Sequence, residues 1–166
     1  MSERRPLALI GFMGSGKSTV GRLVADAAGA THVDLDDLIE EREGMPITAL
    51  FRARGEDAFR AIETELLSTA LTAGHVVSLG GGAPLAENNW TVIRARATSV
   101  WLEAPLETVL ERCDVPTRPL LQGRSEEELR RLFDSRLARY GEADHRIDAT
   151  RDPGVVAEEV LHLWLG

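Results

Sequence analysis

The sequence has little of what marks exported, membrane-bound or disulfide-linked proteins. Cys113 is the only cysteine among 166 residues, so neither an internal disulfide nor a zinc site built of cysteines can form. No apolar run is long enough to span a membrane, and the run that follows the first six residues has four members, too few for the core of a signal peptide. We therefore expect a soluble, cytoplasmic protein.

Basic charge is also scarce. The formal net charge is −8, from 19 Lys and Arg residues against 27 Asp and Glu residues. This balance argues against a broad basic face for nucleic acid or an anionic membrane, so each arginine must be considered singly. The chain also lacks internal repeats, low-complexity segments and linkers. Its length suits one domain with a sizeable core, and we expect residues 1–166 to form that domain.

The most informative stretch is rich in glycine and lies near the start of the chain. Residues 11–19 are GFMGSGKST and match the P-loop pattern G-x-x-x-x-G-K-[ST] at every fixed position. A strand-like apolar run over 7–10 precedes this stretch, and apolar residues at helical spacing follow it. Backbone N–H groups would enclose phosphates, Lys17 would reach the β- and γ-phosphates, and Ser18 would bind Mg²⁺. The alternative, a glycine-rich turn that binds nothing, fits this context poorly.

Two acidic residues, Asp34 and Asp36, end the strand expected over 31–36. Ligands of parallel α/β sheets lie beyond the carboxyl ends of the strands, and side chains two apart on a strand point the same way. Both carboxylates can then face the P-loop, where one could hold Mg²⁺ through water and the other could accept a proton from a substrate hydroxyl. In the alternative, Asp36 caps the helix expected over 37–43. Beside a P-loop we favour the functional interpretation.

A charged pair interrupts the apolar face of the helix expected from Glu56 to about Ala73, after a break at Gly55. Glu63 falls within that face and Arg60 flanks it one turn earlier. Charges in such places need partners or a ligand. The two residues could simply support each other as an ion pair, or Glu63 could steady Arg60 against an anionic substrate, which we favour.

Three consecutive glycines, Gly80–Gly82, follow a strand expected over 76–79. Ordering them is costly in entropy, which suggests that the backbone approaches another group closely; a flexible turn is equally compatible with the glycines alone. A helix over 87–96 and a strand over 99–103 come next. Strands and helices therefore alternate along the chain.

Arginines in the second half of the chain occupy unusual positions. A helix is expected from Pro105 to about Cys113, and the aperiodic stretch over 114–124 is predicted to be a loop of the kind that often forms a lid. Arg118 in that loop could close on phosphates, and Arg112 just before it could stack on a base.

A capping box at Ser125 begins a long helix. Its apolar face has Arg136 near the centre and Arg139 at the margin. A buried arginine needs an anion, from the protein or from a ligand, and the spacing does not decide which. A last strand over 145–148 and a helix from Pro153 to near Trp164 complete the expected elements.

These features together predict ATP-dependent phosphoryl transfer to a small anionic acceptor that carries a hydroxyl group. The motifs also resemble those of the shikimate kinase family, in the same order and from the P-loop to the last helix. The segments that carry the resemblance are GFMGSGKSTVGR (11–22), D-x-D (34–36), FR-x-IE (59–63), SLGGGA (78–83), RPLL (118–121), R-x-x-x-Y (136–140) and R-x-P (151–153).

The resemblance implies an α/β fold of three layers, the P-loop kinase fold similar to that of nucleoside monophosphate kinases. A five-stranded parallel sheet would lie between helices, with a mobile substrate-binding segment at about 34–63 and a mobile lid at about 112–124. It also implies transfer of phosphate from ATP, with Mg²⁺, to the 3-hydroxyl of shikimate. The products would be ADP and shikimate 3-phosphate, on the route to chorismate and the aromatic amino acids. A monomer is implied as well.

Site residues are implied by the same resemblance. Asp36 would bind the reacting hydroxyl and act as base, while Lys17 and Arg118 would neutralise the phosphates. Mg²⁺ would be bound directly by Ser18 and through water by Asp34. The nucleotide would contact Gly14, Ser15, Gly16, Lys17, Ser18, Thr19, Arg112, Arg118 and Arg151, with Arg112 and Arg151 beside the adenine. Shikimate would contact Asp36, Arg60, Gly81, Arg136, Phe51, Phe59 and Glu63, with Arg60 and Arg136 on its carboxylate.

Two other functions compete with this one. A related kinase that acts on gluconate or a nucleoside monophosphate would share the P-loop, but it gives no reason for the set Asp36, Arg60, Gly81 and Arg136. A GTP-binding switch would need the guanine-reading motif N-K-x-D. That motif is absent, because the only asparagines, Asn88 and Asn89, are followed by Trp90.

Overall fold

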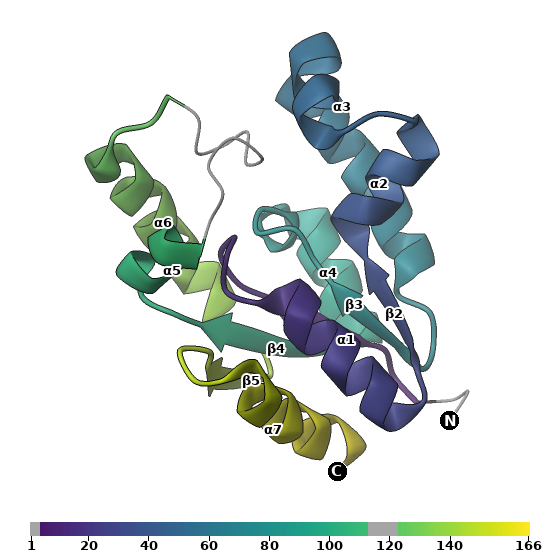
Figure 1. Ribbon diagram of the computed structural model, residues 1–166. Coiled ribbons are helices and arrows are strands. Elements are labelled where there is room, and N and C mark those ends of the chain that lie inside the picture. The colour runs from purple at the N-terminus through teal and green to yellow at the C-terminus, as the bar shows by residue number, and fades with distance from the viewer. Residues whose placement is uncertain (1–3, 113–122) are drawn as a thin grey trace.

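The computed structural model describes residues 4–112 and 123–166. Its five strands are β1 (Leu7–Ile10), β2 (Thr31–Asp34), β3 (His75–Ser78), β4 (Thr98–Glu103) and β5 (His145–Asp148). They form one sheet in the order β2-β3-β1-β4-β5, and every neighbouring pair is parallel. The expected five-stranded parallel sheet is confirmed, and the carboxyl ends of the strands share one edge (Figure 1).

Helices connect these strands. They are α1 (Lys17–Ala28), α2 (Leu35–Glu43), α3 (Ile47–Ala70), the 3₁₀ helix η1 (Ala83–Leu85), α4 (Glu87–Arg96), α5 (Leu106–Arg112), α6 (Glu126–Tyr140) and α7 (Pro153–Leu165). Within the described residues, none is long and apolar enough to cross a membrane.

The side chains of β1 explain why helices cover both faces of the sheet. Ala8 and Ile10 belong to one buried cluster and Leu7 and Leu9 to another, because successive side chains of a strand point to opposite faces. The first cluster includes residues of α2 to α6, and the second includes residues of α1 and α7. The molecule therefore has three layers, and α1 lies beside α7 over one face (Figure 1).

Helix ends follow the local sequence. Gly29 and Gly44 end α1 and α2 in the left-handed conformation that glycine adopts without steric cost. At Gly55 the backbone of α3 leaves the helical conformation (φ 84°, ψ 173°), so the expected division at that residue is confirmed, although the second part ends at Ala70 rather than Ala73. The hydroxyl of Ser125 accepts a hydrogen bond from the backbone N–H of Glu128 (3.1 Å), which confirms the predicted cap of α6.

The sequence-based prediction was wrong at the end of the second strand. That strand was expected to reach Asp36, but β2 ends at Asp34 and α2 begins at Leu35. Asp34 is the N-cap, because its carboxylate accepts a hydrogen bond from the backbone N–H of Asp37 (3.2 Å), and this cap lets the chain pass directly from strand to helix. Asp36 lies in the first turn of α2. It is therefore neither a strand residue nor the N-cap of the helix, and both sequence-based expectations for its position were wrong.

Candidate active site

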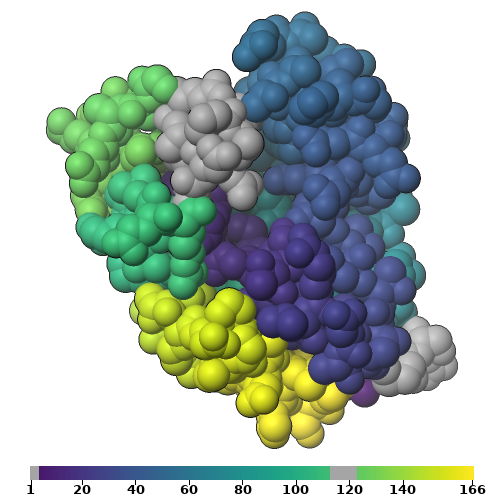
Figure 2. All heavy atoms as spheres, in the orientation of Figure 1, coloured from purple at the N-terminus to yellow at the C-terminus, as the bar shows by residue number. Residues whose placement is uncertain are grey.

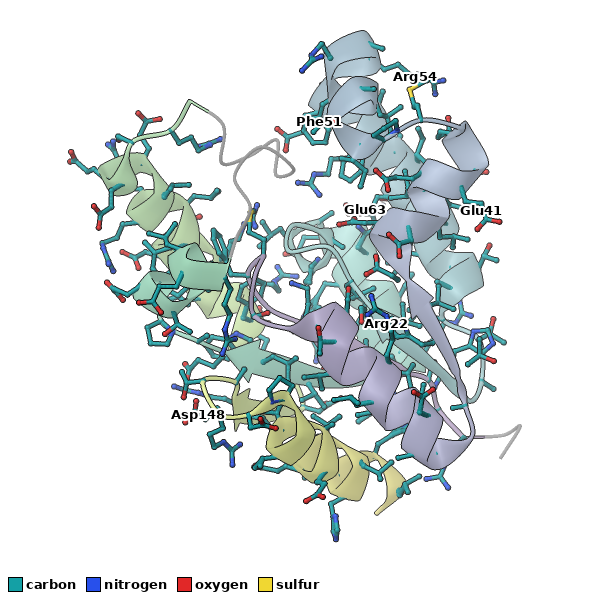
Figure 3. The ribbon with its side chains drawn as sticks, in the orientation of Figure 1. Arg22, Glu41, Phe51, Arg54, Glu63 and Asp148 are labelled. Atoms are coloured by element: carbon teal, nitrogen blue, oxygen red, sulfur yellow. The ribbon has the colours of Figure 1, made fainter. Side chains whose placement is uncertain are left out.

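A cleft of about 980 Å³ lies over the carboxyl edge of the sheet. Its walls come from the P-loop, the start of α2, both parts of α3 and the glycine run after β3. In the space-filling view, the P-loop lies between the part formed by α5 and α6 and the part formed by α2 and α3 (Figure 2). Phe51 and Glu63 both line the cleft from α3, with Phe51 farther from the sheet (Figure 3).

The P-loop leaves its backbone donors available to a ligand. Gly14 and Gly16 have positive φ values of 79° and 98°, and no side chain of the described residues caps the N-terminus of α1. The N–H groups of the first turn and the helix dipole can then attract an anion. Lys17 folds back over the loop, and its ammonium group donates to the carbonyl oxygens of Gly11 (2.7 Å) and Phe12 (3.0 Å). The nucleotide-binding residues of the motif that line the cleft are Gly14, Gly16, Lys17, Ser18 and Thr19.

The two predicted magnesium ligands are in direct contact. The hydroxyl of Ser18 donates a hydrogen bond to one carboxylate oxygen of Asp34, whose other oxygen caps α2. Both offer oxygen donors, the kind that Mg²⁺ prefers. The described residues hold no group of three or more His, Cys, Asp or Glu side chains suited to a metal. Two protein ligands beside a phosphate site fit Mg²⁺, which usually keeps several waters and binds substrate phosphates.

The glycine run is where the other side chains of the cleft converge. A β-carbon at Gly80 would lie 3.0 Å from a carboxylate oxygen of Asp36 and 3.1 Å from one of Glu63. At Gly81 it would lie 2.9 Å from Nη1 of Arg136, and at Gly82 it would lie 2.5 Å from Nη2 of Arg60. Side chains at these three positions would displace the charged groups, so the interpretation as a close backbone approach is supported over a flexible turn.

Arg60 and Glu63 form an ion pair within the cleft. Nη1 of Arg60 lies 2.9 Å from Oε1 of Glu63, and its Nη2 lies 3.4 Å from a carboxylate oxygen of Glu56. Burial raises the pKa of Glu63 above its ordinary value, although the charge of Arg60 opposes this shift. Among the described residues, Oε2 of Glu63 has no hydrogen-bond partner. Both sequence-based interpretations are compatible with this arrangement, because Arg60 is paired and also lines the cleft.

Arg136 is the buried arginine of α6, and Arg139 is not. Arg136 is 2% exposed and lines the cleft, and its Nε and Nη1 atoms have no hydrogen-bond partner in the described part of the chain. Unpaired buried donors of this kind call for an anionic ligand. Arg139 instead pairs with Glu87 and Glu142 and donates to the backbone near η1.

The predicted adenine contacts differ in position. Arg112 lines the cleft and donates to the carbonyl oxygens of Ala149 (3.0 Å) and Ser15 (3.5 Å). Arg151 pairs with Glu159 on α7 (2.5 Å) and is not among the residues that line the cleft. Arg118 and nearly all of the predicted lid at 112–124 lie outside the described residues.

Sequence reasoning did not identify some residues that shape the cleft. Glu40 lines it and accepts a hydrogen bond from the backbone N–H of Ile47 (2.7 Å), which ties α2 to the start of α3. Tyr140 donates its hydroxyl to the carbonyl oxygen of Gly81 (2.6 Å). Glu40 lies on a polar helix face, where a glutamate gives no indication in the sequence that it lines a cleft. For Tyr140 the only signal was its place four residues after Arg136, on the same face of α6.

Comparisons with known proteins agree with this geometry. The model of the shikimate kinase family matches residues 13–164. A shikimate kinase of Persephonella marina is 41% identical over 160 residues, which cover 95% of this chain and 97% of that protein. The structure of a shikimate kinase from Acinetobacter baumannii in complex with shikimate has a TM-score of 0.93 at 34% identity, covering 99% of this chain and 94% of that one. The crystal structure of the Aquifex aeolicus shikimate kinase gives 0.85 at 37% identity, with 96% and 95% covered. The chain therefore belongs to the shikimate kinase family.

Proposed function

We propose that this protein transfers the terminal phosphate of ATP to the 3-hydroxyl of shikimate, which gives shikimate 3-phosphate and ADP on the route to chorismate and the aromatic amino acids. The observation that carries the proposal is the convergence of Asp36, Arg60 and Arg136 on the glycine run, beside the P-loop. One acidic and two basic groups around a single cleft suit an acceptor that has both a hydroxyl and a carboxylate.

The acceptor would lie with its carboxylate between Arg60 and Arg136. Planar guanidinium groups bind carboxylates through charge-assisted hydrogen bonds, and Arg136 has buried donor atoms, Nε and Nη1, without a partner among the described residues. Phe51 and Phe59, whose ring centroids are 4.8 Å apart, would cover the apolar part of the acceptor ring. The backbone at Gly81 would contribute a further polar contact.

Asp36 would accept the proton of the reacting hydroxyl. It lines the same cleft as Lys17, and the backbone of Gly80 lies against its carboxylate. A base fixed in this way can take the proton as the oxygen attacks phosphorus. Positioning of the two substrates and stabilisation of the charge on the transferred phosphate would supply most of the remaining rate acceleration.

Lys17 and the first turn of α1 would hold the nucleotide phosphates. Mg²⁺, when bound, would share their negative charge, with Ser18 as a direct ligand and Asp34 acting through water. The contact of these two side chains fits such a site. The contacts of Ser15, Arg112 and Arg151 with the nucleotide, and the roles of Arg118 and a lid at 112–124, stay predictions. So do a single domain over 1–166, the mobility of the segment at 34–63, a monomeric state and a cytoplasmic location.

A coupled assay of ADP release tests the proposal. The purified protein receives ATP and Mg²⁺ with shikimate, gluconate or AMP, and each rate is compared with the rate without acceptor. Of the three acceptors, we expect only shikimate to raise the rate of ADP release. Turnover with gluconate or AMP, and none with shikimate, would favour the related kinase instead; the family match and the acceptor residues speak against that outcome.

A further inference from the structure

The two arginines of the acceptor site are held in different ways. Arg60 is an ion-pair partner of Glu63 and Glu56. Arg136 is nearly fully buried, yet no carboxylate of the described residues lies within ion-pair distance of it. The charge of Glu63 acts on Arg136 only from beyond ion-pair distance, so groups in direct contact with the guanidinium must help to hold it.

A side chain of the P-loop is one of these groups. The guanidinium carbon of Arg136 lies 5.3 Å from the ring centroid of Phe12, within the range of a cation–π contact. Phe12 is 2% exposed, and the ring of Phe133 packs against it at 73° with centroids 5.2 Å apart. The ring that supports Arg136 therefore lies within the apolar core.

The backbone of Phe12 contacts the other end of the site. Its carbonyl oxygen accepts a hydrogen bond from the ammonium group of Lys17 (3.0 Å). One residue thus contacts the phosphate-side lysine through its backbone and the acceptor-side arginine through its side chain.

We propose that Phe12 is a positioning residue of the acceptor site: its ring holds the Arg136 guanidinium in the cleft without neutralising it. A carboxylate in this place would also fix the arginine, but it would compete with the carboxylate of the acceptor. An aromatic face attracts the cation through its quadrupole and carries no net charge. The inference rests on the proposed function and adds a positioning residue to it.

The test compares two substitutions that remove similar volume from the same apolar cluster. Phe12→Leu removes the ring under Arg136, whereas Phe133→Leu removes a neighbouring ring that makes no cation–π contact with an arginine of the described residues. We expect Phe12→Leu to raise the KM for shikimate by about tenfold to thirtyfold, the effect of losing a cation–π contact away from water. Its kcat and its KM for MgATP should stay close to those of the parent protein. Equal increases in the two variants would overturn the proposal.

A double-mutant cycle separates an effect of Phe12 that acts through Arg136 from a general effect on packing. Phe12→Leu should lower kcat/KM for shikimate in the parent protein but have no further effect in an Arg136→Met background. The same fold-loss in both backgrounds would refute a role through Arg136. Should Phe12→Leu not fold, Phe12→Met keeps an apolar chain of similar length and allows the same comparison.

These outcomes separate the two proposals. A parent protein that does not phosphorylate shikimate contradicts the proposed function itself. An active parent in which Phe12→Leu behaves like Phe133→Leu contradicts only the role of Phe12.

Discussion

Replacing Gly82 with alanine perturbs one contact of the acceptor site and little else. The backbone at Gly82 has φ −91° and ψ −11°, a conformation that alanine adopts without strain. The added β-carbon would lie 2.5 Å from Nη2 of Arg60, whereas ordinary van der Waals contact begins at 3.4 Å, so the guanidinium must retreat by about 0.9 Å. Arg60 is long and its side chain is 28% exposed, so the arginine should move rather than the backbone.

That displacement should appear in the KM for shikimate. A hydrogen bond to a charged group contributes about 1.5–3 kcal/mol, and its loss corresponds to roughly a tenfold to hundredfold rise in KM. Steady-state assays with shikimate varied at saturating MgATP measure the effect. Circular dichroism and cooperative unfolding should show that the variant still folds.

The Arg60→Ala background is the control for Gly82→Ala. The three atoms nearest to the new methyl group all belong to the Arg60 guanidinium, so without that group Gly82→Ala should cause no further rise in the KM for shikimate. An unchanged KM in the single variant, or equal losses in the two backgrounds, would refute the reasoning from close approach.

Other predictions concern the base, the carboxylate-binding arginine and the buried tyrosine. Asp36→Asn should reduce kcat by on the order of a hundredfold or more and leave ATP binding nearly intact, because only the proton acceptor is lost; an equal loss of ATP affinity in a binding titration would count against this role. Arg136→Met should weaken shikimate binding strongly and Arg139→Met weakly, and the reverse order by calorimetry would assign the carboxylate to Arg139. Burial raises the pKa of Tyr140, the only tyrosine, from 10.0 to about 12, so its ultraviolet absorbance should not show ionisation near pH 10 in the native protein. Because the folded-state pKa is the higher one, the stability that depends on the neutral hydroxyl is complete below pH 10 and is lost as the pH rises towards 12. Urea unfolding of the parent protein and of Tyr140→Phe at several pH values measures this loss of stability. The same dependence of stability on pH in the two proteins would contradict the prediction.

Local patterns were enough to predict much of the fold. The strand, P-loop and α1 follow from fixed residue types and periodicity, and the cap at Ser125 follows from the capping-box pattern. The central place of Arg136 on the face of α6 followed from helical geometry alone, and its burial confirms that placement.

Features that depend on distant contacts could not be predicted in this way. The end of β2 was misplaced, because three acidic residues lie within the four positions 34–37 and each could have capped α2, and only the structure shows that Asp34 does so. The glycine run gave no indication of which side chain meets which glycine, since Asp36, Arg60 and Arg136 come from three different helices. Phe12 occupies a variable position of the P-loop motif, so its contact with Arg136 leaves no trace in the pattern.

A crystal structure with ADP, Mg²⁺ and shikimate would test the central claim most directly. The account predicts the carboxylate of shikimate between Arg60 and Arg136, with its 3-hydroxyl at Asp36 and facing the phosphate end of the nucleotide. Shikimate bound with its carboxylate away from both arginines, or with the 3-hydroxyl out of reach of Asp36, would contradict it.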